Sequence, residues 1–156
     1  MGIWSLRKNG IEYDSSIFPI ERKFGGIKGV PSNKPFVINT QSGLLKEFPM
    51  NSVSMLNKNL VFSGGGFFRI LPYQIIKSLV KSSEYVMTYL HLRDFDNNQP
   101  FNTLSFSRHI KSRIGTKGAL KKLDNLIESF DFIDLEQAAN SINWNKVEVI
   151  NLQDKI

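Results

Sequence analysis

The sequence predicts an α/β fold, and three of its properties support that prediction. Short apolar runs typical of strands alternate with segments of helical periodicity, most clearly in the second half of the chain. Glycine and proline separate these segments at short intervals, as they do in compact domains. The 156 residues, 41% of them hydrophobic and 22% charged, are enough for one domain with a buried core.

The first third of the chain is predicted to hold one short helix and several short strands. Ile3 to Lys8 predicts a helix that Asn9-Gly10 ends, and Ile11 to Asp14 predicts a strand that finishes in a carboxylate. Glycines and prolines make residues 23–35 a predicted loop. Residues 36–38 and 43–48 then predict two further strands or a hairpin.

The rest of the chain is predicted to alternate between helices and strands. Pro72 marks the first turn of a helix with one apolar face, and Tyr85 to Leu92 predicts a buried strand. The remaining predicted elements are a helix over 104–113, a helix capped by Thr116, a strand at 132–133, a helix over 135–142 capped by Asp134, and a last strand or extended tail over 147–152.

The charge of the chain is +6, and its basic residues gather between Arg108 and Lys122, where no acidic residue occurs. Acidic residues follow directly, so a solvated surface with local compensation is the simpler interpretation. No nucleic-acid-binding motif accompanies the charge, and we expect no nucleic-acid partner. No apolar run approaches the length of a membrane span and no secretory signal is present, so a cytoplasmic location without membrane contact is expected. The absence of cysteine excludes disulfides.

His91 is the strongest candidate for chemistry, because it ends the predicted 85–92 strand and acidic loop residues follow. A histidine in such a place can act as an acid or base, although a structural histidine at a strand end is the alternative. Asp14 also ends a predicted strand, and a carboxylate beside an imidazole can orient it. Asp94 and Asp96 are expected to cap the turn. Gly64 to Gly66 do not form a phosphate loop, and predict a close backbone approach or a positive φ.

Three segments of the chain, taken together, resemble a known family. The first is Tyr13-Asp14-Ser15-Ser16-Ile17-Phe18-Pro19, which is similar to the Tyr-Asp-Ser-Ser-Ile-Phe-Pro signature of NodB-homology polysaccharide deacetylases of exopolysaccharide and capsule loci. The second, Phe62 to Tyr73, resembles that subgroup's Ser-Gly-Gly-Gly-Tyr-Phe-Arg-Leu-Leu-Pro-Tyr block. The third, Tyr89 to Asp96, resembles its Tyr-Phe-His-Pro-Trp-Glu-Phe-Asp block. The three occur in the family's order, and the resemblance runs from about Trp4 to about Ala139.

The resemblance implies a deformed (β/α) barrel that removes N-acetyl groups from amino sugars in a polysaccharide. Family members bind zinc or another divalent metal, and a late histidine protonates the leaving amine. His91 matches that histidine, and Asp14 lies where the family has a carboxylate on an earlier strand. Leu90 and Leu92 would help to form the pocket floor for the acetyl methyl group, and Tyr13 would contact the sugar.

The family's Thr-Phe-Asp-Asp, His-x-x-x-His and Arg-x-Pro blocks have no counterpart in this chain, and Leu92-Arg93 replaces the family's Pro-Trp pair. The resemblance therefore implies a C-terminal part of the barrel over residues 1–140, with residues 141–156 as an extension. We expect this chain alone to bind no metal and to be inactive without an N-terminal half of the barrel or a homo-oligomeric partner. The alternative is a non-catalytic carbohydrate-binding or scaffold module using aromatic residues such as Tyr13, Phe67 and Tyr89.

Overall fold

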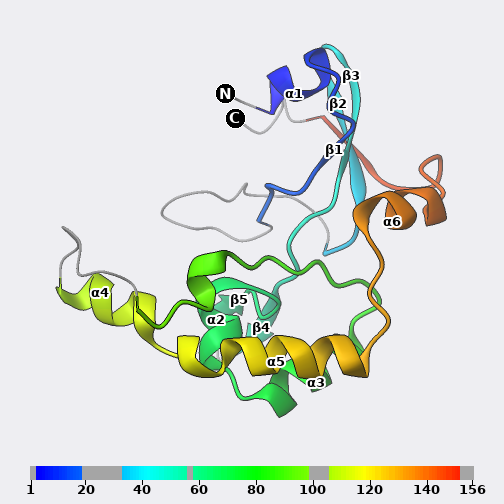
Figure 1. The fold of residues 1–156 in the computed structure, drawn as a ribbon. Coiled ribbons are helices and arrows are strands. Elements are labelled where there is room, and N and C mark those ends of the chain that lie inside the picture. The colour runs from blue at the N-terminus through cyan, green and yellow to red at the C-terminus, as the bar shows by residue number, and fades with distance from the viewer. Residues whose placement is uncertain (1–2, 19–32, 56–57, 99–105, 152–156) are drawn as a thin grey trace. The chain divides into compact units, whose positions relative to one another are not determined.

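The chain folds into two compact units in the computed structural model, which describes residues 3–18, 33–55, 58–98 and 106–151 (Figure 1). Unit 1 comprises Met1–Ser52 and Ile133–Ile156, and unit 2 comprises Val53–Phe132. Most of the predicted 23–35 loop and the start of the predicted 104–113 helix lie outside the described residues. None of the helices in the described ranges combines the length and the apolar character that a membrane span requires.

Unit 1 is built on a four-stranded sheet in the order β1-β3-β2-β6. The predicted hairpin is confirmed, because β2 (Phe36–Thr40) pairs antiparallel with β3 (Gly43–Glu47). The turn between them is closed by Thr40, whose hydroxyl donates to the carbonyl of Gly43 at 2.6 Å. On the outer side of β3, β1 (Tyr13–Asp14) runs parallel to it, and on the far side of β2, β6 (Val149–Asn151) runs parallel to that strand. The predicted first and last strands are thus also present.

One face of this sheet carries the core of unit 1. The alternation of side chains along a strand puts Phe36 and Ile38 of β2 on the same face as Leu45 of β3. Ile17 and Ile150 complete the cluster, and Ile3 and Leu6 pack against it from the short helix α1 (Trp4–Lys8) and its start. Because Ile150 belongs to this core, the residues after 140 are part of the unit, while the expected domain boundary at residue 140 stays a prediction.

Two helix boundaries in unit 1 follow the sequence signals. Helix α1 ends at Lys8 and is capped by Asn9, and Gly10 takes a φ of +80°, the left-handed conformation that glycine adopts at low cost. Helix α6 (Leu135–Ser141) begins after Asp134, whose carboxylate accepts a hydrogen bond from the backbone N–H of Gln137 at 2.8 Å.

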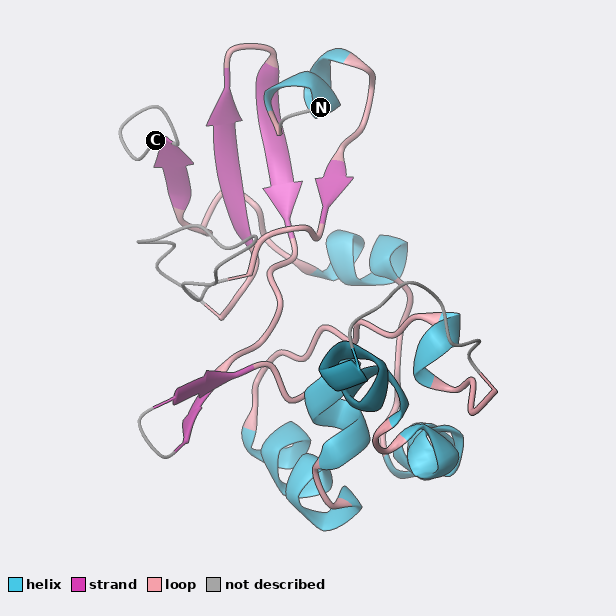
Figure 2. Cartoon of the chain, turned by 90° about the vertical axis from the view of Figure 1, so that its left-hand side faces the viewer, coloured by secondary structure: helices cyan, strands magenta, loops and turns pink. Residues whose placement is uncertain are grey.

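Unit 2 is mainly helical, with one two-stranded antiparallel ribbon, β4 (Val53–Met55) and β5 (Lys58–Leu60) (Figure 2). Its helices are α2 (Gly65–Ile70), α3 (Tyr73–Ser82), the 3₁₀ turn η1 (Leu92–Asp94), α4 (Phe106–Arg113) and α5 (Thr116–Ser129). Their apolar faces enclose a core of Phe62, Phe68, Ile76, Val80 and Leu126. The chain therefore contains both a sheet and helices, and the barrel type stays a prediction.

The predicted strand over 85–92 does not form. Within it, Tyr89 alone makes a bridge, to Gly64, and the chain then winds into η1 at Leu92. The reason is that the neighbouring segment enters helix α2 at Gly65 and so offers no longer edge for pairing. The strand predicted at 132–133 does not form either, because no strand in the described part of the chain pairs with it and both side chains are exposed.

Thr116 is the first residue of α5 and not its cap. Gly115 precedes it with a φ of +77°, and an added Cβ there would lie 2.3 Å from the carbonyl oxygen of Arg69. Glycine is required at this position both for its conformation and for the close approach of helix α2.

Lys122 closes the carboxyl end of α2. Its ammonium group donates to the carbonyl oxygens of Phe68, Arg69 and Leu71 at 3.1, 2.6 and 2.9 Å. These carbonyls have no partner further along the helix, so the cation satisfies them and complements the negative end of the helix. Burial lowers the pKa of the Lys122 ammonium below its ordinary value.

Replacing Lys122 by methionine is expected to lower the free energy of unfolding by about 1.5–3 kcal/mol, because charged hydrogen bonds to three carbonyls are lost. Lys121 is exposed and adjacent, so Lys121→Met should change stability by no more than about 0.5 kcal/mol. Urea unfolding of the two variants checks the prediction, and equal effects would contradict it.

Candidate functional site

Two of the three segments that carry the resemblance lie side by side in unit 2. Gly64 and Tyr89 form a parallel bridge, in which the N–H of Gly65 donates to the Tyr89 carbonyl at 3.0 Å. The N–H of Tyr89 donates to the Ser63 carbonyl at 3.3 Å, and the Ser63 hydroxyl donates to the Met87 carbonyl at 2.7 Å. These contacts hold the start of the 62–73 segment directly against the strand-like approach to His91.

Gly64 permits this contact. An added Cβ at Gly64 would lie 2.1 Å from the carbonyl oxygen of Tyr89, which is far inside contact distance. Gly65 beside it has a φ of +56°. The prediction from the sequence that these glycines mark a close backbone approach and a positive φ is confirmed.

Gly64→Ala is expected to destabilise the chain by about 1–3 kcal/mol, because the new methyl group forces the Gly64–Tyr89 bridge apart. Gly66 lies two residues on, inside α2, where an added Cβ would meet Arg69 at an ordinary 3.7 Å. Gly66→Ala should therefore be neutral or stabilising by up to about 1 kcal/mol. Thermal unfolding of the two variants separates these outcomes, and a Gly64→Ala protein as stable as the parent would refute the role of the bridge.

A buried ion pair joins the same two segments a second time. The Nε of Arg69 lies 3.2 Å from Oδ1 of Asp94, and the two side chains are only 10% and 4% exposed. The N–H of this Nε finds no well-aligned acceptor among the described residues, so the contact is mainly electrostatic. The guanidinium group of Arg69 also donates to the carbonyls of Ser112 and Lys111.

Asp94, which the ion pair with Arg69 holds in place, also forms hydrogen bonds with the backbone of His91. Oδ2 of Asp94 accepts a hydrogen bond from the backbone N–H of His91 at 2.9 Å, and the N–H of Asp94 donates to the His91 carbonyl at 2.8 Å. The expected turn-capping role of Asp94 is confirmed. Asp96 also caps a turn, by accepting from the N–H of Asn98 at 2.8 Å. The backbone of His91 is thus held by a residue that is itself held by Arg69.

The imidazole of His91 is exposed at this fixed position. Its one ring neighbour among the described aromatic contacts is Tyr89, edge to face at 4.6 Å between centroids. An accessible imidazole on a fixed backbone can exchange a proton with a bound molecule. We refer to His91, Tyr89 and their supports Gly64, Arg69 and Asp94 as the His91 platform.

Leu90 and Leu92, the two leucines expected at the pocket floor, lie in different surroundings. Leu90 packs against the buried cluster of the unit, whereas the side chain of Leu92 is 90% exposed. The chain turns into η1 after Leu90 and directs Leu92 to solvent, and the expectation that both line one acetyl pocket stays a prediction.

Asp14 lies in unit 1, where it has a partner that the sequence analysis missed. The register of β1 and β3 pairs Asp14 with Glu47, so both carboxyl groups are on the same face of the sheet. Glu47 is completely buried, and its Oε1 accepts a hydrogen bond from the N–H of Ile17 at 3.0 Å. Asp14 is half-buried, and its Oδ2 accepts from the Ser16 hydroxyl at 2.7 Å.

Burial raises the pKa of Glu47 from 4.5 to about 8, and the neighbouring charge of Asp14 adds to this shift. Glu47 therefore carries a proton at neutral pH. The sequence contained a sign of this burial. Leu45 and Glu47 are two residues apart in a predicted strand, so they share one face, and Glu47 therefore occupies a position where an apolar residue is expected.

Tyr13 points to the opposite face of the sheet from Asp14. Its ring packs edge to face against Phe48, with 6.3 Å between the ring centroids. The ammonium group of Lys46 lies 5.1 Å from the centroid of the Tyr13 ring. The same ammonium group lies 5.3 Å from the ring of Trp144. Tyr13 is thus half-buried, and it shares the Lys46 ammonium group with Trp144 in two cation–π contacts.

Asp14 belongs to unit 1 and His91 to unit 2, so neither unit by itself brings the two predicted catalytic side chains together. Among the described residues, no three His, Asp or Glu side chains gather in a way that could hold a metal ion.

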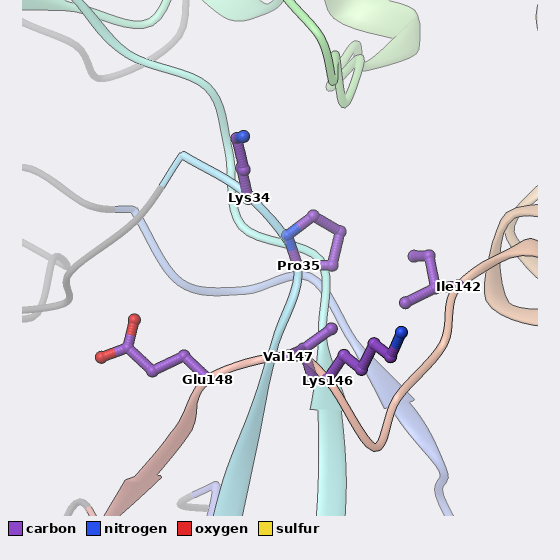
Figure 3. Close-up of a pocket in the computed structure, with 6 residues that line it drawn as sticks. All are labelled: Lys34, Pro35, Ile142, Lys146, Val147 and Glu148. Carbon is purple, nitrogen blue, oxygen red and sulfur yellow. The ribbon is translucent and has the colours of Figure 1, made fainter.

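A hollow of about 370 Å³ in unit 1 is lined by Lys34, Pro35, Ile142, Lys146, Val147 and Glu148 (Figure 3). It contains none of the residues predicted from the sequence to act in chemistry. In Figure 3 the Glu148 carboxylate and the Lys146 ammonium point away from each other, so they do not form an acid–base pair in the hollow.

Comparison with protein families matches residues 15–140 to the family described as "Domain of unknown function (DUF3473)". The chain belongs to the DUF3473 family. The part that matches this family begins directly after Asp14 and includes Glu47 and the whole His91 platform. Comparisons with curated proteins and with solved structures found no match.

Proposed function

We propose that this DUF3473 chain is a polysaccharide deacetylase-like protein that binds a polymer of N-acetylated amino sugars through the His91 platform. The observation that supports this most is the joining of two resembling segments, 62–73 and 89–96, around one exposed histidine. A backbone bridge and a buried ion pair, each between residues 25 positions apart, join the two segments into one support. The side chain of His91 is exposed on this support. That arrangement suits an acid–base residue better than a structural histidine.

The chemistry that His91 would serve is hydrolysis of an acetamide. Water adds to the carbonyl carbon, the C–N bond breaks, acetate leaves, and the amine nitrogen takes up a proton. Expulsion of an unprotonated amine is unfavourable, so a general acid beside the nitrogen accelerates the step. A protonated His91 imidazole would supply that proton, and the Tyr89 ring beside it would contact the sugar face.

The divalent metal of the resembled family does not fit the described residues, because they offer no cluster of three ligating side chains. The chain also has no cysteine and only two histidines. The proposed role of His91 depends on its own imidazole and on the bound sugar.

We expect the chain alone to release no acetate from an N-acetylglucosamine oligomer in the presence of zinc, above the rate of the protein-free mixture. Acetate quantified by NMR checks this. Zinc-dependent acetate release by the purified chain would show that it assembles a complete metal site, contrary to the proposal.

Binding of an acetylated oligomer tests the proposed function directly. The chain is expected to bind the N-acetylglucosamine oligomer, and to bind a glucose oligomer of the same length more weakly, in isothermal titration calorimetry. Equal affinity for both oligomers would show that the chain does not recognise the acetamide group. No binding to either oligomer would overturn the proposal.

A non-catalytic carbohydrate-binding module is favoured by a separate observation. Phe67, which follows the glycine segment, and Tyr89, which is bridged to Gly64, keep 36% and 37% of their surface exposed. Exposed aromatic rings stack on sugar faces through their apolar area. On this alternative His91→Gln would leave oligomer affinity unchanged while Tyr89→Ala lowers it, whereas the acid–base role predicts that both changes lower it.

A further inference from the structure

Glu47 is a buried acid that the proposed role of His91 does not use. It is the last residue of β3, where the register pairs it with the buried Phe36 of β2 and the buried Leu45 lies on the same face. Among the described residues, the ionisable group that acts on it is Asp14. A carboxyl group in such surroundings is costly to bury unless it is protonated or paired.

Glu47 lies against both ends of residues 14–17, which we call the Asp14 segment. Oε1 fixes the backbone N–H of Ile17, three residues beyond Asp14. Oε2 has no hydrogen-bond partner among the described residues, while the strand register pairs Glu47 with Asp14 and the charge of Asp14 acts on the Glu47 carboxyl group. A protonated Oε2 is a donor, and the Asp14 carboxylate is the acceptor that the register supplies.

Ser16 completes the arrangement from the solvent side. Its hydroxyl donates to Oδ2 of Asp14 at 2.7 Å, and Ser16 itself is exposed. Asp14 is therefore paired with the buried Glu47 on one side and bound by the exposed Ser16 hydroxyl on the other, and Glu47 also holds the N–H of Ile17.

We propose that Glu47 is the positioning residue of Asp14: it holds a proton against the Asp14 carboxylate and fixes the Ser16–Ile17 backbone, so that this carboxylate can accept a hydrogen bond from a bound amino sugar. The inference rests on the proposed function, because it takes the ligand of Asp14 to be an N-acetylated sugar. Loss of the Glu47 proton would set two carboxylates beside each other and displace the Asp14 segment.

The first readout concerns position alone. In NMR spectra of the full chain, the Ile17 amide nitrogen should shift as pH rises through about 8, where Glu47 loses its proton. Glu47→Gln should abolish the shift, and Glu12→Gln, at an exposed site before β1, should preserve it. An Ile17 resonance that is constant in the parent chain, or that still titrates in Glu47→Gln, would overturn the proposal.

The second readout concerns the ligand. Affinity for the N-acetylglucosamine oligomer should be about tenfold weaker at about pH 9 than at about pH 7 in the parent chain. Glu47→Gln should keep the affinity of about pH 7 at both values, and Asp14→Asn should weaken binding at both. If Glu47→Gln keeps the parent's pH dependence, the positioning role fails. If the parent binds at neither pH, the proposed function fails, and the Ile17 readout still decides whether Glu47 controls this segment.

Discussion

Replacing Glu47 by glutamine is expected to remove most of the pH dependence of the free energy of unfolding between pH 4.5 and about 8. In this window the folded chain keeps a proton on Glu47 that the unfolded chain has released. Stability therefore falls as pH rises, by roughly 1 kcal/mol for each pH unit. The stabilising effect is complete below the unfolded pKa and is lost as pH passes the folded one.

Urea unfolding at several pH values in this window measures the slope. Glu47→Gln, which keeps the shape of the side chain without its acid proton, should show a flatter profile and should exceed the parent in stability above about pH 8. Glu12→Gln is the matched control, because Glu12 is exposed and directly precedes β1. A parent and a Glu47→Gln variant with the same slope would show that Glu47 is charged or solvated in the folded chain.

Replacing Asp94 by asparagine is expected to cost about 3 kcal/mol or more, because it leaves the buried guanidinium group of Arg69 without its counter-charge. The amide oxygen of asparagine can still accept from the His91 N–H, so the loss reports mainly on the ion pair. Asp96→Asn serves as the control, since Asp96 is in the same loop outside the ion pair and an amide oxygen can also accept from Asn98.

Chemical unfolding of the two variants gives the comparison. A double-mutant cycle with Arg69→Met isolates the coupling between Arg69 and Asp94. Asp94→Asn and Asp96→Asn variants of equal stability would contradict the view that this ion pair holds the His91 platform together.

The elements that local signals control could be predicted from the sequence. The 36–48 hairpin, the helix start at Pro72, the Asp134 cap and the stop at Asn9-Gly10 are all found where the residues indicate them. Each of these depends on the conformational preference of a few neighbouring residues, so no distant contact can override it easily.

The strand predicted over 85–92 failed because a strand needs a partner, and the partner segment turns into α2 after Gly64. Periodicity describes the apolar positions of one segment and carries no information about the length of the edge beside it. The division into two units was likewise invisible in the composition.

For the candidate site, the sequence indicated His91 and Asp14 but none of the charged residues that support them. Arg69 lies 22 residues before His91, and Glu47 lies 33 residues after Asp14, so no local spacing connects them. Arg69 and Glu47 stand out because their charged side chains are buried. Burial depends on tertiary contacts, so the spacing of residues in the sequence does not show it. The role of Gly64 could be predicted, because glycine is the residue that a close approach of two backbones requires.

The resonances of the His91 imidazole during titration with an N-acetylglucosamine oligomer test the central claim most directly. The proposed function predicts saturable shifts of the His91 and Tyr89 ring signals. Tyr73 should stay unchanged, because its hydroxyl is held by Asn125 within unit 2. Unchanged His91 signals at saturating oligomer would contradict the proposal that this platform binds an amino sugar.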